Sequence, residues 1–241
     1  LHELKEAARA CFDIATAYGT PFISGKDSMF NDFRGYTETG ENIHISAIPT
    51  LLISAIGVIP DVTYAMTIDF KQPGDSIYLI GETNDELGAS EYLNMSGLTK
   101  SRHGEVPKVD AKKNAKAYDS LSKSIQNNLV ASAIGVGRGG LAAALAKSAI
   151  AGQLGADIAL KNLPGNAKLG DSILFSESQG RMLVSVRPEA KAAFEKIYQG
   201  LTLVEIGTVG GGAVSIELPK MRVETSVSEL TTAYRSFFKN W

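Results

Sequence analysis

The chain has 241 residues, of which 44% are hydrophobic and 21% are charged, and its formal net charge is −2. This composition is typical of a globular protein with one domain or two small ones, and it gives no general attraction to nucleic acid or to an anionic membrane surface. The single cysteine, Cys11, excludes an internal disulfide framework and a thiolate zinc cluster. Without a signal region or an apolar run long enough for a membrane span, the sequence predicts a cytoplasmic protein.

The first quarter of the chain predicts one helix, two buried strands and a loop. Apolar residues recur at helical spacing over residues 3–18, with Cys11 on the expected buried face and Gly19 at the expected end. Short buried strands are predicted at Phe22-Ile23 and over the nearly continuous apolar run 49–60. Between them, residues 31–46 predict a mobile loop or a hairpin with His44 pointing outward. Because the chain opens at Leu1 inside a helical pattern, we expect a piece of a longer polypeptide.

The remainder of the chain alternates strand and helix patterns, so the fold class predicted is mixed α/β. A domain boundary is predicted near residue 70, where the composition changes before a strong apolar strand. We expect strands at residues 76–81, 129–136, 157–160, 172–175, 182–186, 203–209 and 213–216, and helices at 89–95, 110–128, 141–152, 188–199 and 226–239. Residues 99–109 predict a charged, solvated loop in which His103 has no partner at metal-ligand spacing.

The segment Ser24–Asp32 is the first candidate site. It places a glycine, a lysine, two serines and two aspartates directly after an apolar lead-in. Glycine lets backbone N–H groups approach a ligand, lysine adds a mobile positive charge, and a serine hydroxyl donates to phosphate or binds a metal. The segment therefore suggests a phosphorylated small molecule, although it lacks the spacing of a Walker loop. The alternative is a plain loop capped by Asp and Ser.

Two further segments combine polar or glycine residues at the expected ends of strands. Gly137-Arg138-Gly139-Gly140 lies between a strand and a helix, where free N–H groups and the helix dipole favour an anion. The alternative is close packing of an alanine-rich helix against the sheet. The second segment is the corner Glu177-Ser178-Gln179, predicted between two strands, which suits hydrogen bonding to a polar ligand or a plain turn.

Taken together, these segments resemble the C-terminal part of the phosphoribosylformylglycinamidine synthase family, within the aminoimidazole ribonucleotide synthetase-like superfamily. The resemblance covers nearly the whole chain. It is carried by the initial helix and by residues 21–29, 74–81, 86–93, 139–146, 175–181 and 206–209. It implies that residues 1–70 are the end of an ATP-grasping, synthetase N-terminal-like half. Residues 71–241 then form the synthetase C-terminal-like α/β domain.

The resemblance implies an ATP-dependent ligase of purine biosynthesis. In such an enzyme formylglycinamide ribonucleotide, ATP and ammonia from glutamine give formylglycinamidine ribonucleotide, ADP and phosphate, with Mg²⁺ as cofactor. The implied partners are the upstream half of the same synthase and a glutaminase domain or subunit. Catalytic residues and the main magnesium ligands would lie upstream, so the fragment alone is expected to be inactive.

By the same resemblance, Gly25 contacts nucleotide and Ser28 contacts a phosphate. Lys26 stands where relatives place a magnesium-binding asparagine; because an ammonium group cannot bind a cation, we expect Lys26 to contact phosphate. Glu177, Ser178 and Gln179 match a segment that touches substrate in the first α/β half of relatives.

The sequence Gly135-Val136-Gly137-Arg138-Gly139-Gly140 lacks the aspartate and serine that relatives often carry there. This departure predicts a weakened or lost magnesium-nucleotide site in residues 71–241. Two alternatives follow: a non-catalytic scaffold or interaction module of the synthase, or another ATP-dependent kinase or synthetase of the superfamily, such as a thiamine-phosphate or selenophosphate enzyme. The latter would be expected to carry aspartate-rich metal loops.

Overall fold

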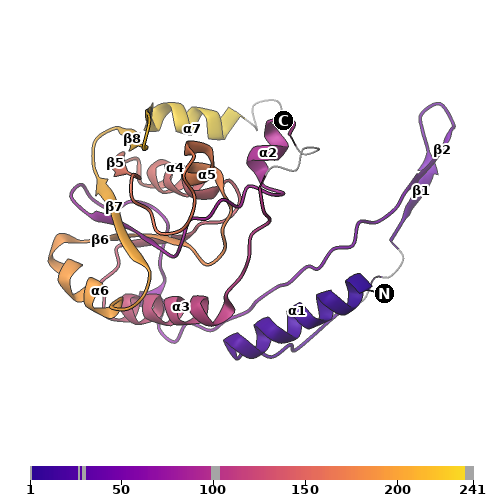
Figure 1. Cartoon of the computed structure of the whole chain (residues 1–241), viewed down its shortest axis with the longest axis horizontal. Coiled ribbons are helices and arrows are strands. Elements are labelled where there is room, and N and C mark those ends of the chain that lie inside the picture. The colour runs from indigo at the N-terminus through magenta and orange to yellow at the C-terminus, as the bar shows by residue number, and fades with distance from the viewer. Residues whose placement is uncertain (1, 27, 29–30, 99–103, 237–241) are drawn as a thin grey trace. The chain divides into compact units, whose positions relative to one another are not determined.

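The computed structural model describes residues 2–26, 28, 31–98 and 104–236, and the chain divides into two compact units, residues 1–58 and 59–241 (Figure 1). This division falls about a dozen residues before the expected boundary near residue 70, which stays a prediction. Asp27, His103 and the last residues of the predicted C-terminal helix lie outside the described residues.

The first unit consists of one helix and one hairpin. Helix α1 covers His2–Tyr18 and ends at Gly19 with φ +65°, as predicted. Strands β1 (Phe33–Tyr36) and β2 (Asn42–Ile45) pair antiparallel, which confirms the hairpin alternative. Asp32 holds the base of the hairpin, because its carboxylate accepts hydrogen bonds from His44 Nε2 at 2.8 Å and from Ala47 N at 3.1 Å. These bonds, that of His44 first, lower the pKa of Asp32.

Two strand predictions in the first unit are wrong. Phe22 and Ile23 are exposed and form no strand, and the apolar run 49–60 is extended but unpaired and largely exposed. Cys11 is only half-buried, and no described residue of 1–58 is buried. A strand that is apolar on both faces needs packing partners on both sides. The described part of the first unit contains no such partners.

A seven-stranded sheet forms the centre of the second unit, in the order β4-β6-β3-β7-β5-β8-β9. All neighbouring strands are antiparallel except β5 and β8, which confirms the mixed α/β class. Strand β5 lies between β7 and β8, so the glycine turn 210–212 does not close a hairpin. The strands are β3 (Ser76–Ile80), β4 (Ser132–Gly135), β5 (Ala156–Ala159), β6 (Met182–Val186), β7 (Leu203–Val209), β8 (Ala213–Glu217) and β9 (Arg222–Ser226).

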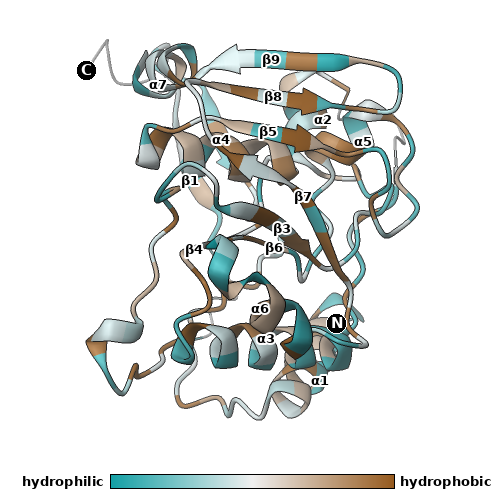
Figure 2. Ribbon diagram, turned by 90° about the vertical axis from the view of Figure 1, so that its left-hand side faces the viewer, coloured by the Kyte–Doolittle hydropathy of each residue, from teal (hydrophilic) through white to brown (hydrophobic). Residues whose placement is uncertain are grey.

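The helices cover both faces of this sheet. On one face lie α4 (Gly140–Gly152), α5 (Gly170–Phe175) and α7 (Val227–Ser236); on the other lie α3 (Ala111–Gln126) and α6 (Lys191–Ile197) (Figures 1 and 2). Short segments complete the unit: α2 (Glu91–Met95) and the 3-10 turns Val62–Tyr64 and Pro188–Ala190. Residues 172–175 belong to α5, so the strand predicted there is wrong, and β9 was not predicted. In the described part of the chain no helix is long and apolar enough to cross a bilayer.

Strand β3 explains why the second unit has two cores. Its alternate side chains point to opposite faces, so Ile77 and Leu79 pack with α4 and α5, whereas Tyr78 and Ile80 pack with α3 and α6. Every residue of β3 is buried, as expected for a strand covered on both sides. Figure 2 shows the apolar residues concentrated along these central strands.

The turn that leads into β3 contains a fully buried carboxylate. Asp75 is 0% exposed; its Oδ1 accepts a hydrogen bond from Gln72 Nε2 at 3.3 Å, and its Oδ2 has no partner among the described residues. Backbone bonds between Asp75 and Val209 and between Gly74 and Val209, both 2.9 Å, fix the turn against β7. Loss of solvation raises the pKa of Asp75, and the Gln72 bond offsets this only in part.

Asp75→Asn is expected to stabilise the chain increasingly as the pH rises. A raised native pKa means that ionised Asp75 opposes folding: stability is fully present below its ordinary pKa of 3.8 and is lost as the pH rises through the native pKa. Urea unfolding of both proteins from below pH 3.8 up to neutral pH measures the difference in unfolding free energy. A difference that stays constant across this range would contradict the role of Asp75.

Candidate functional site

The predicted phosphate loop brings its lysine and serine side chains together. Lys26 Nζ donates to Ser28 Oγ at 3.3 Å. Gly25, Lys26 and Ser28 are all exposed, and the space where a Cβ of Gly25 would lie is open. An ammonium group and a hydroxyl at this separation can contact one phosphate group together. The structure therefore gives the loop a solvent-accessible cation and hydroxyl on the first unit.

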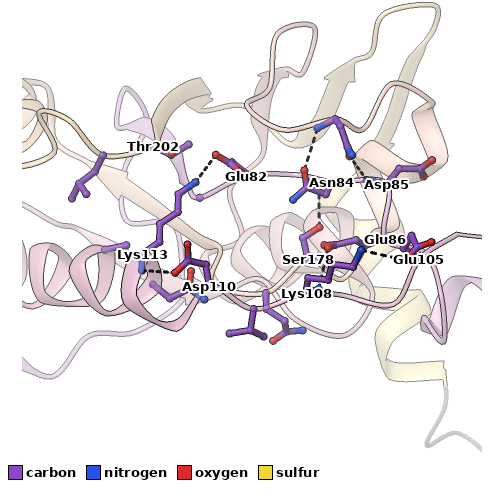
Figure 3. Close-up of a pocket in the computed structure, with 18 residues that line it drawn as sticks. Glu82, Asn84, Asp85, Glu86, Glu105, Lys108, Asp110, Lys113, Ser178 and Thr202 are labelled. Atoms are coloured by element: carbon purple, nitrogen blue, oxygen red, sulfur yellow. Dashed lines mark hydrogen bonds and ion pairs between the residues drawn. The ribbon is translucent and has the colours of Figure 1, made fainter. Parts of the chain in front are cut away.

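A second candidate site is a polar cavity of about 440 Å³ that lies wholly in the second unit (Figure 3). Its walls come from the segment after β3, the turn before α3, the first turns of α3, the corner 178–180, and Asn166, Leu201 and Thr202. Polar side chains from several of these segments converge in Figure 3. The cavity therefore lies where the polar ends of several sheet and helix segments meet.

A buried arginine holds the corner that forms one wall of the cavity. Arg181 is 2% exposed, and its guanidinium donates to Ser178 O at 3.0 Å, Thr83 Oγ1 at 3.1 Å and Ser176 O at 2.5 Å. Burial lowers the pKa of Arg181 to about 10, against the opposing effect of Glu86 and Glu177. The guanidinium therefore stays charged near neutral pH, and it fixes the path of residues 176–178.

The carboxylate of Glu177 occupies the position expected for a bound anion. Its Oε1 accepts hydrogen bonds from Gly139 N and Glu91 N, both at 2.9 Å. Gly139 directly precedes helix α4, so the N–H group that the glycine-rich turn was predicted to offer to a ligand is engaged by the protein itself. Arg138 forms an ion pair with Glu91 rather than standing free. In the glycine-rich turn, Gly139 N and the Arg138 side chain are therefore already bound by carboxylates of the same chain.

The other two residues of the corner line the cavity. Ser178 is 1% exposed, and its Oγ accepts a hydrogen bond from Asn84 N at 3.1 Å. Gln179 is exposed, and its Nε2 donates to Glu177 O at 2.9 Å. Gly180 follows with φ +78°, a conformation that favours glycine, and a Cβ there would lie 2.2 Å from Asn114 Oδ1, so a larger residue would displace the Asn114 side chain. Ser178 and Gln179 therefore line the cavity, whereas the Glu177 side chain points to the glycine-rich turn.

Sequence reasoning did not single out several residues of this site. Glu86 and Arg181 are buried charged residues. Asn166 Oδ1 accepts a hydrogen bond from Asp85 N, and Asn84 Oδ1 accepts one from Asn166 N. One signal was present: residues 82–86 are polar and follow the end of a buried strand, where α/β proteins commonly bind ligands. In the described part of the chain no group of three or more His, Cys, Asp or Glu side chains is placed to hold a metal ion.

Comparison with known proteins defines the family of this fold. Residues 72–218, more than half of the chain, match the family described as AIR synthase related protein, C-terminal domain, and the chain belongs to this family. Over 236 residues it is 32% identical to the phosphoribosylformylglycinamidine synthase subunit PurL of Alkaliphilus metalliredigens. That match covers 97% of this chain and 30% of the relative, so the chain spans about a third of the length of that protein. The resemblance seen in the sequence is confirmed.

Solved structures support the same fold. Thermotoga maritima PurL complexed with FGAR matches with a TM-score of 0.66 and 18% identity, over 91% of this chain and 36% of the other. The same protein complexed with ATP matches with a TM-score of 0.61 and 18% identity, over 91% and 34% of the two chains. At these identities the matches establish the fold alone.

Glu177→Ala is expected to lower the free energy of unfolding by about 1–3 kcal/mol, because two backbone N–H groups lose their acceptor. Glu189→Ala is the matched control, since this exposed glutamate forms a surface ion pair with Arg187, worth under about 1 kcal/mol. Urea unfolding followed by circular dichroism gives both values. Equal effects of the two substitutions would show that Glu177 does not hold the turn.

Proposed function

We propose that the chain is the C-terminal part of a phosphoribosylformylglycinamidine synthase and contributes one wall of its nucleotide site. The observation that carries this proposal is the similarity to PurL over 97% of the chain, which includes both candidate sites. The reaction would activate the amide oxygen of formylglycinamide ribonucleotide with ATP and replace it by ammonia. Phosphoryl transfer of this kind depends on positioned charges more than on covalent catalysis by side chains.

In this proposal the exposed loop of the first unit contacts the nucleotide. Gly25 lets the backbone approach, and Lys26 and Ser28 together contact a phosphate group, which their 3.3 Å separation supports. Mg²⁺, when bound, would neutralise phosphate charge. The described residues provide no cluster of metal ligands, so the magnesium ligands would come from the upstream half. Ser178 and Gln179 are proposed to contact a polar ligand in the second unit, with Glu177 holding their corner in place.

The proposed partner of the first unit is the upstream half of the same synthase. The apolar run 49–60 supports this, because Leu52, Ile56 and Val58 are each more than 80% exposed, as is Ile48 just before the run. Contiguous exposed apolar surface of this extent marks an interaction site. The 30% coverage of the relative is consistent with a partner supplied by the rest of the longer polypeptide.

A glutaminase domain or subunit is the proposed source of ammonia. A Thermotoga maritima structure described as PurLQS matches this chain with a TM-score of 0.60 and 19% identity, over 91% of this chain and 34% of the other. The description of that structure names components besides PurL, which supports an assembly of this kind.

A chimera tests the proposed function. The 236 matching residues of the Alkaliphilus metalliredigens subunit are replaced by this chain, and ammonia-dependent phosphate release from ATP is measured with the ribonucleotide. The chimera is expected to turn over, whereas this chain alone is not. Lys26→Met should lower kcat/KM about tenfold or more, since a hydrogen bond to a charged group contributes about 1.5–3 kcal/mol.

Lys5→Met is the control for this substitution, because Lys5 is an exposed lysine of α1 outside the loop. Robust turnover by the chain alone would contradict the proposal that it is incomplete. Equal activities of the Lys26 and Lys5 variants would remove Lys26 from the nucleotide site.

The structure favours one alternative for residues 71–241, a scaffold that binds no nucleotide of its own. The favouring observation is that Glu177 already accepts from Gly139 N, so this N–H group at the start of α4 is not available to a phosphate. A second anion placed there would meet a carboxylate at close range, which is unfavourable.

Calorimetric titration of the chain with ATP and Mg²⁺ separates the two roles of the second unit. If the second unit is a scaffold, any binding comes from the loop of the first unit alone, and Lys26→Met should weaken it about tenfold or more. Tight, magnesium-dependent binding whose affinity Lys26→Met leaves unchanged would show a nucleotide site retained in the second unit.

A further inference from the structure

The cavity of the second unit carries an excess of negative charge. Its described lining residues include five carboxylate side chains and two lysines but no arginine. Both lysines are already paired, Lys113 with Glu82 at 2.5 Å and Lys108 with Glu105 at 3.4 Å. Phosphate-binding cavities concentrate cations and free N–H groups. This cavity instead concentrates carboxylates, and both of its described lysines are engaged in ion pairs.

Glu86 is a buried hydrogen-bond acceptor on the wall of the cavity. It lines the cavity and is 6% exposed; its Oε1 accepts from Lys108 N at 3.0 Å, whereas its Oε2 has no hydrogen-bond partner among the described residues. The nearby guanidinium of Arg181 attracts this carboxylate but directs its hydrogen bonds to Ser178, Thr83 and Ser176, so Oε2 has lost its hydration without gaining a donor, which is costly. Because Oε2 is screened from solvent, an incoming N–H or O–H group would restore the missing hydrogen bond after a small movement of the Glu86 side chain.

The other polar side chains around the cavity are held in fixed directions. Asn166 Oδ1 accepts from Asp85 N at 2.7 Å, and Asn84 Oδ1 accepts from Asn166 N at 3.2 Å. Because their oxygens are engaged with backbone, the amide NH₂ groups of both asparagines remain to donate to a ligand. Figure 3 shows Asn84, Glu86 and Ser178 close together on this wall. The wall therefore combines fixed donors with one strong, unpaired acceptor.

We propose that this cavity is a binding site for a small, unphosphorylated molecule rich in hydroxyl and amino groups, whose donor reaches Glu86. The net negative lining favours an amine over a neutral polyol and disfavours a phosphate. A metal ion does not fit, since the described residues form no cluster of metal ligands. Because the proposed site lies wholly in the second unit, a failure to bind these ligands would not contradict the proposed synthase function.

Glucosamine, glucose and glucosamine 6-phosphate form a matched set of probes, differing in an amine and in a phosphate. Each is titrated into the whole chain in slightly acidic buffer, where the amine is protonated, and backbone amide shifts are followed by NMR. Glucosamine is expected to shift the amides around the cavity and to bind more tightly than glucose. Glucosamine 6-phosphate is expected to bind about tenfold more weakly than glucosamine or not at all, because its phosphate would meet the net negative lining of the cavity.

Glu86→Gln tests the proposed acceptor directly. It should weaken glucosamine binding about tenfold, since an ammonium group forms a stronger hydrogen bond to a carboxylate than to a neutral amide. Glu189→Gln is the control, because Glu189 is exposed and does not line the cavity. The unperturbed amides of each variant report whether it is folded. Should Glu86→Gln fail to fold, the three probes on the unmodified chain still decide the question.

Three results would overturn the proposal. The first is equal or tighter binding of glucosamine 6-phosphate, which would make the cavity an anion site. The second is shifts that lie outside the cavity for all three probes, and the third is a folded Glu86→Gln variant that binds glucosamine as the control does.

Discussion

The second unit depends on one buried charge, the guanidinium of Arg181. Removing it from water is costly, and the structure offsets this with two carbonyl groups, a hydroxyl and the nearby carboxylates of Glu86 and Glu177. Because the acceptors belong to the loop after β3 and to the corner before β6, the arginine joins the ends of two neighbouring strands. Both the cavity wall and the carboxylate that fills the glycine turn follow from this arrangement.

The two units satisfy the physical requirements of folding in different ways. The second unit covers both faces of its sheet with helices and buries every residue of β3. The described part of the first unit buries no residue and exposes an apolar run. Burial of apolar surface is the dominant favourable contribution to folding. The first unit therefore needs surface from outside itself, which agrees with the proposed role as part of a larger synthase.

Local patterns in the sequence predicted the helices and strands of the second unit well. They did not predict in detail which of its residues are buried. Strand β3 and helices α3 and α4 follow from apolar periodicity, since a buried strand and an amphipathic helix each require their own spacing. Residues 172–175 were assigned to a strand because four residues cannot distinguish a buried strand from one turn of helix. The run 49–60 has strand composition but no neighbour in the described structure to pair with.

Some features of the candidate sites likewise follow from the sequence, and others depend on the tertiary structure. Sequence alone determined the family, the mixed α/β class and the chemical character of the loop Gly25–Ser28, because these depend on residue types and short spacings. Only the tertiary structure decided that Glu177 turns to Gly139 while Ser178 turns to the cavity, and that Glu86 is buried with a carboxylate oxygen unpaired. Such contacts join residues far apart in the chain, and no local pattern specifies which backbone groups will meet.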